Sequence, residues 1–300
     1  MNKVKFVYSE KYFADLQGHV FQNDKYAAVY EKLKTERHLP PEAFLVPEPA
    51  TKEELALVHT EGYLKDFLNL KLTSHTITSE LPLTEDIRDS YIMMAGGTIL
   101  ACEVAVKEKT AVMNIGGGFH HAYADMAQGF CYLNDIAIGI EKSFQDGLIK
   151  SAMVIDCDLH QGNGTAHIFR ENREVFTFSI HQENNFPIKE KSNKDISLPD
   201  FAADELYLEL LEKTVPDELI SFYPELVVYV AGADPYCDDK LGGLCLTLEG
   251  LKRRDELVID AVKKIAAPLV VVLAGGYAFN PKDTALIHYN TAQTMLEIYG

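Results

Sequence analysis

Short apolar runs alternate with longer amphipathic segments along most of the chain. The runs are rich in Val and Ile, as in strands buried on both faces of a parallel sheet, and they cover residues 111–115, 151–155, 175–180, 226–230 and 269–273. Helical patterns cover residues 51–70, 89–108, 134–146, 202–214, 247–265 and 284–299. This alternation predicts right-handed βαβ units and an α/β fold with a doubly wound, mostly parallel sheet flanked by helices.

The length and composition are those of one globular domain. The chain has 300 residues, of which 47% are hydrophobic and 24% charged. Residues 38–54 carry four prolines and read as a loop before a helix. No internal repeat or interdomain linker stands out, so residues 1–300 are predicted to form a single domain.

Charge and cysteine content narrow the classes of partner. A formal net charge of −17 argues against direct binding to nucleic acid or to an anionic membrane. The five cysteines include no C-x-x-C pair, so we expect neither a disulfide framework nor a thiolate zinc site. The chain shows no signal peptide and no apolar run of roughly twenty residues. These features favour a cytoplasmic location without excluding the nucleus, and they leave the oligomeric state open.

Four of the five apolar runs end in clusters of Gly, His, Asp or Tyr. In an open parallel sheet the carboxyl ends of the strands share one edge, where ligand sites lie. We therefore expect these clusters to converge. They are Gly116-Gly117-Gly118-Phe119-His120-His121, then residues 156–164 (DCDLHQGNG), Ala231-Gly232-Ala233-Asp234, and Ala274-Gly275-Gly276-Tyr277.

The second cluster has the composition of a metal site. Alternate residues of an extended segment face one side, so Asp156, Asp158 and His160 can share a face. Asp234 would add a ligand from another strand end. Asp158, His160 and Asp234 together favour zinc, with Fe²⁺ as an alternative, and three protein ligands leave one coordination position open for catalysis. Helix capping would explain either aspartate alone, but it explains the combined pattern less well.

The other two clusters supply candidate catalytic groups. The pair His120-His121 follows three glycines, and two imidazoles beside a metal could serve as base and acid. Tyr277 follows Gly275-Gly276, and its hydroxyl could donate to a developing oxyanion.

These motifs together resemble the histone deacetylase superfamily, which shares its general fold with arginase. The resemblance runs from about Phe6 to the C-terminus, and it is densest in GGGFHHAYADMAQGFCYLND, VIDCDLHQGNGTA, AGADPYCDDKLGGL and AGGY. It is greatest to class IV enzymes and their bacterial relatives. It implies that Asp158, His160 and Asp234 bind zinc, that His120 and His121 are the tandem histidines, and that Tyr277 stabilises the transition state.

The resemblance also implies roles around these groups. Asp156 would support His120, whereas Asn163 stands where class I enzymes have a second aspartate. We therefore expect His120 to carry charge and His121 to stay neutral as the general base. The substrate-binding residues implied are Gly129, Phe130, Phe186, Gly275 and Gly276. A potassium-type site is implied at Asp156, Ser179 and Ile180, with the backbone of Asp158 and His160.

One family feature has no clear equivalent in the sequence. Class I enzymes hold the substrate backbone with an acidic residue at the channel rim. Glu85 and Asp86 are candidates for this role.

The function expected is a zinc-dependent amidohydrolase that removes an acetyl or longer acyl group. Its substrate would be an acylated lysine in a peptide or protein, or another acylated amine. An arginase-type ureohydrolase is the first alternative, but it needs ligands for a second metal, and after Asp234 the next aspartate is Asp238. The second alternative is a non-catalytic protein that binds acylated lysine, which would be expected to have lost part of this residue set.

Overall fold

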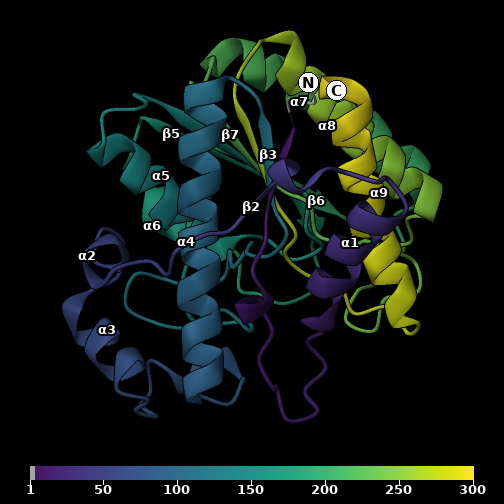
Figure 1. Ribbon diagram of the computed structural model, residues 1–300. Coiled ribbons are helices and arrows are strands. Elements are labelled where there is room, and N and C mark those ends of the chain that lie inside the picture. The colour runs from purple at the N-terminus through teal and green to yellow at the C-terminus, as the bar shows by residue number, and fades with distance from the viewer. Residues whose placement is uncertain (1–3) are drawn as a thin grey trace.

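A single eight-stranded sheet runs through the computed structural model, which describes residues 4–300 (Figure 1). Its strand order is β2-β1-β3-β8-β7-β4-β5-β6, and every neighbouring pair is parallel. The strands are β1 (Lys5–Val7), β2 (Phe44–Leu45), β3 (Ala111–Asn114), β4 (Ala152–Asp156), β5 (Val175–Gln182), β6 (Lys194–Leu198), β7 (Leu226–Val230) and β8 (Leu269–Val272). The predicted α/β fold with a doubly wound sheet is confirmed.

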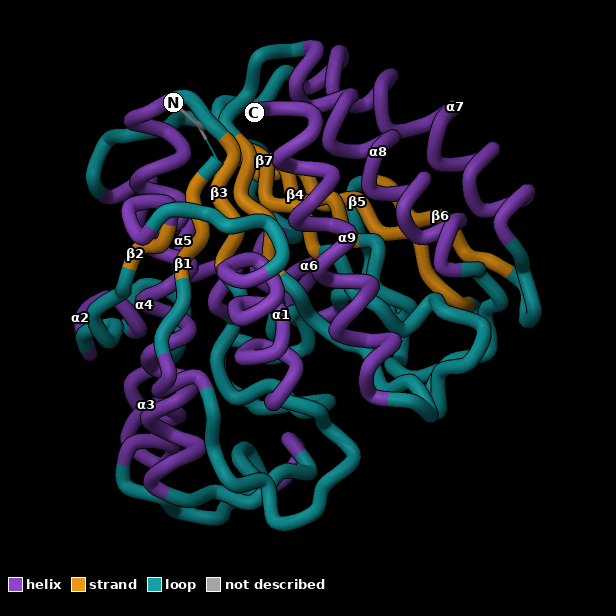
Figure 2. The backbone as a smooth tube through the Cα atoms, turned by 45° about the vertical axis from the view of Figure 1, so that its right-hand side comes forward, coloured by secondary structure: helices purple, strands orange, loops and turns teal. Residues whose placement is uncertain are grey.

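Helices cover both faces of the sheet (Figure 2). They are α1 (Asp24–Thr35), α2 (Lys52–Leu55), α3 (Glu61–Leu68), α4 (Glu85–Glu108), α5 (Asp135–Gln145), α6 (Asn163–Phe169), α7 (Asp204–Phe222), α8 (Leu248–Lys264) and α9 (Pro281–Tyr299). Alternate strand residues face opposite sides. Val154 and Val228 thus join the core formed with α4 and α5, whereas Ile155 and Tyr229 join the core formed with α7, α8 and α9.

The predicted strands match strands of the structure, whereas one predicted helix does not match. The five apolar runs became β3, β4, β5, β7 and β8. The helix predicted over residues 51–70 is wrong as one element, because it divides into α2 and α3. Thr60 caps α3 by accepting from the Tyr63 N–H, and its own N–H donates to the Ala124 carbonyl at 2.8 Å. This tertiary contact interrupts a pattern that is locally continuous.

Helix α4 is the longest helix, and by length and composition it could span a membrane. The expectation of no such segment was therefore too strict. In the structure, 61% of its apolar window is buried, and α4 packs against α5 and β3. A helix that is apolar on most sides is typical of a protein core.

The cysteines form no disulfide framework among residues 4–300, but Cys237 and Cys245 form one bond. An odd number of cysteines does not exclude a single pair. The two residues meet because the flanking residues Tyr236 and Leu246 form a β-bridge. The other cysteines, Cys102, Cys131 and Cys157, are free and buried.

A buried cation fixes the ends of β4 and β7. Arg254 of α8 is fully buried, and its Nη1 donates to the Cys157 carbonyl at 3.2 Å and to the Gly232 carbonyl at 2.6 Å. Its counter-ion is Asp255, whose Oδ1 accepts from Nη2 at 2.8 Å. Asp255 also accepts from Tyr229 of β7 at 2.6 Å and from Thr291 of α9 at 2.5 Å. One ion pair therefore connects α8 and α9 to two strand ends.

Removing the charge of Asp255 should destabilise the protein strongly. Asp255→Asn leaves Arg254 buried without a counter-ion, and breaking such a pair typically costs ~3–5 kcal/mol. Urea denaturation would measure the loss. Asp260→Asn is the matched control on the same helix, because its pair with Lys264 is at the surface and should contribute at most ~1 kcal/mol. Equal effects of the two variants would contradict this role of the buried pair.

Candidate active site

The four polar clusters meet at the carboxyl edge of neighbouring strands. β3, β8, β7 and β4 are consecutive in the sheet, and each is followed by one cluster. The convergence inferred from the strand ends is therefore present.

Three of these residues form a cluster suited to a metal ion. Asp158, His160 and Asp234 are buried, and each offers a ligand atom within 4.8 Å of the others. His160 Nδ1 lies 3.2 Å from Asp158 Oδ1 and 3.1 Å from Asp234 Oδ2. One imidazole nitrogen with two carboxylate oxygens is a donor set that fits a borderline divalent ion.

The electrostatics of the cluster also favour a cation. Burial opposes charge on His160, but its hydrogen bonds to the Asp158 and Asp234 carboxylates outweigh it and raise the pKa of His160 to about 10. Burial and the neighbouring Asp158 charge raise the pKa of Asp234. Two buried carboxylates this close require a compensating positive charge, which a divalent ion would supply.

His120 is held by an aspartate. Its Nδ1 lies 2.7 Å from Asp156 Oδ2, and both side chains are buried. Burial disfavours the charged ring, but the charges of Asp156 and Asp158 outweigh it and raise the pKa of His120 to about 9. This pKa favours the protonated form of His120 at neutral pH.

His121 has a neutral partner instead. Its Nδ1 lies 2.8 Å from Asn163 Oδ1. Burial, together with the neighbouring His120 and His160, lowers the pKa of His121 well below its usual range. The two rings are 4.0 Å apart between centroids, so adjacent histidines differ in protonation, because carboxylate charges offset burial at His120 and burial dominates at His121.

Tyr277 is positioned by its backbone and by aromatic neighbours. Its N–H donates to Asp239 Oδ2 at 2.6 Å, and its ring lies against Phe130 and Phe21. Burial and the nearby Asp234 and Asp158 raise the pKa of Tyr277 well above its usual value. The hydroxyl therefore remains protonated and can donate a hydrogen bond.

The glycine segment before His120 needs glycine for steric reasons. Gly118 has φ +87°, and a Cβ there would lie 2.6 Å from the Ala274 nitrogen. Asp135 at the start of α5 accepts from the Gly118 and Phe119 N–H groups at 3.1 and 2.8 Å. The segment thus approaches the β8 loop closely while one carboxylate fixes its backbone.

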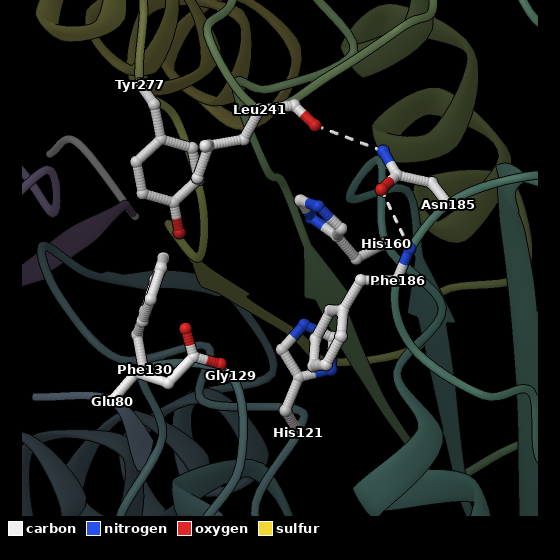
Figure 3. Close-up of a pocket in the computed structure, with 9 residues that line it drawn as sticks. All are labelled: Glu80, His121, Gly129, Phe130, His160, Asn185, Phe186, Leu241 and Tyr277. Atoms are coloured by element: carbon white, nitrogen blue, oxygen red, sulfur yellow. Dashed lines mark hydrogen bonds between the residues drawn. The ribbon is translucent and has the colours of Figure 1, made fainter. Parts of the chain in front are cut away.

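A channel leads from the surface to these groups (Figure 3). It has a volume of about 250 Å³, and its lining residues are Glu80, His121, Gly129, Phe130, His160, Asn185, Phe186, Leu241 and Tyr277. Phe186 contacts the His121 ring edge-on at 5.1 Å between centroids, and Phe130 contacts Tyr277 similarly at 5.8 Å. A Cβ on Gly129 would lie 2.8 Å from Phe186, so glycine keeps this channel open.

A smaller inner cavity continues the channel. It shares His121, Gly129, His160 and Tyr277 with the outer channel, and its volume is about 20 Å³. Phe21, Gly118, Cys131 and Ala274 are among the residues that enclose it. The space is about that of one water molecule.

The acidic residue at the channel rim is Glu80, which the sequence interpretation missed. Glu80 ends a short 3₁₀ helix (Ile77–Ser79) with φ +65° and lines the channel mouth. The candidates Glu85 and Asp86 are wrong for this role, because both lie in the first turn of α4 and neither lines the channel. Asn185 and Leu241 were also missed, although Asn185 precedes Phe186 and Leu241 lies within the motif AGADPYCDDKLGGL.

Of the two glycines before Tyr277 that were assigned to substrate binding, Gly275 lines the inner cavity. The Gly275 N–H donates to Asp158 Oδ2 at 2.9 Å, so this group orients a metal ligand. Gly276 lines neither cavity, and its neighbours are Thr284 and Ala233.

The residues of the predicted potassium-type site lie on adjacent strands. Asp156 of β4 pairs in register with Ser179 of β5, and Ile180 follows it in the same strand. All of these residues are buried.

Comparison with known proteins identifies the family. The histone deacetylase domain model matches residues 19–292. The chain belongs to the histone deacetylase family. Histone deacetylase 2 of Arabidopsis thaliana is 32% identical over 92% of this chain and 75% of its own length. The protein AcuC of Bacillus subtilis, named for acetoin utilization, is 28% identical over 90% of this chain and 74% of its own length.

Two further comparisons cover nearly the whole chain. An uncharacterised protein of Picosynechococcus is 34% identical over 98% of both chains. The solved structure of an HDAC homologue complexed with SAHA has a TM-score of 0.84 at 24% identity, covering 97% of this chain and 84% of that one. Membership of this family makes the protein a deacetylase, a hydrolase of amide bonds.

Within residues 4–300, Asp158, His160 and Asp234 form the one group of at least three side chains that could hold a metal ion. Asp238 is exposed, and the buried Asp239 accepts from the Tyr277 and Leu241 N–H groups. The described part of the chain therefore offers no second ligand set of the arginase type.

Removing the Tyr277 hydroxyl should abolish most of the deacetylase activity. Tyr277→Phe is expected to lower kcat by about 10²–10³, the usual effect of losing one oxyanion donor. Metal content, measured by elemental analysis, should stay unchanged because the hydroxyl is not a ligand. A kcat close to that of the unmodified protein would contradict the oxyanion role.

Proposed function

We propose that the protein is a zinc-dependent lysine deacetylase, with Fe²⁺ as the alternative metal. The observation that carries this proposal is the convergence, at the inner end of one channel, of the Asp158, His160 and Asp234 cluster with His121 and Tyr277. A substrate that reaches this point would meet a metal site, a neutral base (His121) and a hydrogen-bond donor (Tyr277) in one enclosed space.

Each group has a distinct role in amide hydrolysis. A metal ion held by Asp158, His160 and Asp234 would polarise the amide carbonyl and acidify water. His121, which is neutral and faces both cavities, accepts the proton from the attacking water. Tyr277 donates to the developing oxyanion, and charged His120 adds positive potential beside it. One of the two histidines then protonates the leaving amine.

The channel fits a lysine side chain. Phe130 and Phe186 provide apolar walls for a methylene stem, and Gly129 leaves room between Phe186 and His121. Acylated lysine in a peptide or protein is therefore the proposed substrate.

The inner cavity favours a short acyl group. Its volume of about 20 Å³ leaves space of the order of one methyl group or one water molecule. Longer acyl chains would require the Gly118 and Ala274 segments to move apart, and these segments already abut. We propose acetyl as the preferred acyl group.

A potassium ion is proposed as a further ligand, at the place the family resemblance implies. Its support is the register that places Asp156 beside Ser179 on two buried strands, with Ile180 next along the chain.

Hydrolysis of a panel of acyl-lysine peptides would test the proposed function. Acetyl-lysine should be cleaved fastest and long-chain acyl-lysine slowest, because the inner cavity is small. A chelator should abolish cleavage, and added zinc should restore it. Failure to cleave any acyl-lysine or acetylated polyamine by the metal-loaded protein would sink the deacetylase proposal.

Glu80 should contribute to the binding of peptide substrates. Its carboxylate at the channel mouth can accept from backbone N–H groups of a peptide. Glu80→Ala is expected to raise KM for acetyl-lysine peptides about fivefold, with little change in kcat, because the lost hydrogen bond is to a solvent-exposed carboxylate.

Glu85→Ala is the matched control for this variant. It removes another exposed acid that does not line the channel. If both variants changed KM equally, the effect would come from net charge and not from contact at the rim.

A further inference from the structure

The side-chain amide of Asn163 determines which nitrogen of His121 carries the proton. An amide presents an acceptor oxygen on one side and a donor NH₂ on the other. With Oδ1 facing His121, as the 2.8 Å contact has it, Nδ1 donates and Nε2 keeps its lone pair. Rotation of the amide by half a turn would favour the opposite tautomer, in which Nε2 cannot act as a base.

Two acceptors on the far side of Asn163 hold the amide in the productive orientation. Asn163 Nδ2 donates to Gln128 Oε1 at 2.5 Å and to the Tyr123 hydroxyl oxygen at 2.9 Å. Asn163 is buried, whereas the two acceptors are partly buried. A rotated amide would place its oxygen against the Tyr123 hydroxyl oxygen, whose proton is directed at Glu190, and it would also require the Gln128 amide to rotate.

The Glu190 carboxylate determines which groups donate and which accept in this chain of hydrogen bonds. The Tyr123 hydroxyl lies 3.4 Å from Glu190 Oε1, which as a carboxylate oxygen can only accept. Tyr123 therefore donates to Glu190, and its oxygen stays available to Asn163. His167 Nδ1 lies 3.2 Å from the same Glu190 oxygen.

Glu190 is itself held in place by the metal-site segment. Gln161, the neighbour of His160, donates from Nε2 to the Glu190 carbonyl at 2.6 Å. Gln161 Oε1 accepts from the Glu190 N–H at 2.8 Å. The partially exposed carboxylate thus has a fixed backbone, and hydrogen bonds lead inward from it to the base.

We propose that Gln128, Tyr123 and Glu190 are positioning residues that lock the Asn163 amide and thereby keep the His121 proton on Nδ1. This inference rests on the proposed role of His121 as the base. Its consequence is that a neutral amide can replace the carboxylate of class I enzymes only where such acceptors surround it.

The double variant Tyr123→Phe/Gln128→Met removes both acceptors while keeping similar volume. Asn163 can then rotate, so ¹⁵N NMR of the imidazole nitrogens should show His121 losing its Nδ1–H signal in favour of Nε2–H. For acetyl-lysine peptides kcat should fall about tenfold to hundredfold, within the range for loss of a general base, while KM changes little. Unchanged tautomer and kcat would overturn the proposal.

Asn163→Asp in the double-variant background separates positioning from packing. A carboxylate presents acceptor oxygens in either orientation, so it needs no lock. The triple variant should recover the Nδ1–H signal and a kcat within about threefold of the Asn163→Asp single variant, because residues that act as one unit are not additive. Absence of this rescue would mean that Tyr123 and Gln128 only pack, and would overturn the proposal.

Tyr63→Phe is the control, because it removes a tyrosine hydroxyl outside this hydrogen-bond chain, bonded to the Tyr132 carbonyl at 2.7 Å. It should lower stability without altering the His121 tautomer. If the double variant unfolds, Gln128→Met alone provides the same comparison with a smaller shift. The NMR signal needs no turnover, so it decides the lock even if the unmodified protein cleaves no acylated substrate and the proposed function fails.

Discussion

The arrangement of the site depends on the buried Arg254 and its ion pair with Asp255. Where β4 and β7 end, their chains leave the sheet ladder, and the carbonyls of Cys157 and Gly232 lose strand partners. Buried carbonyls without a partner are costly, and one guanidinium satisfies both. Cys157 precedes Asp158, and Gly232 lies two residues before Asp234. A cation that lines neither cavity therefore holds the backbone beside two residues of the candidate metal site.

The parallel arrangement of the strands explains why much of the site could be inferred from the sequence. Parallel strands place their carboxyl ends on one edge, so polar residues after β3, β4, β7 and β8 had to approach one another. Continuous apolar runs identified these central strands, and the ligand set followed from spacing within DCDLH and from Asp234. The pairing of His120 with Asp156 and of His121 with Asn163 followed from the family resemblance. The structure gives each pair a contact below 3 Å.

The features that the sequence did not reveal depend on tertiary contacts. β1 and β2 have three and two residues, too few to show a period. Glu80 enters the channel because its φ is +65° and because the loop before it packs on residues 127–130, through the Phe130 N–H to the Ser79 carbonyl. Gly275 proved to support Asp158 because its N–H points at that carboxylate. None of these relations has a local pattern that would identify it.

The contrast between the two histidines shows how proteins assign different tasks to identical side chains. Both rings are buried and lie 4.0 Å apart, so burial alone would make both neutral. The charge of Asp156 opposes burial at His120, whereas at His121 burial and the neighbouring His120 and His160 outweigh the Asn163 hydrogen bond and the charge of Asp158. An amide carries no charge, but rotation can exchange the positions of its acceptor oxygen and its donor NH₂, so either can face the partner. The choice of asparagine for a neutral base therefore creates a second requirement, namely acceptors on the far side of the amide, which Gln128 and Tyr123 meet.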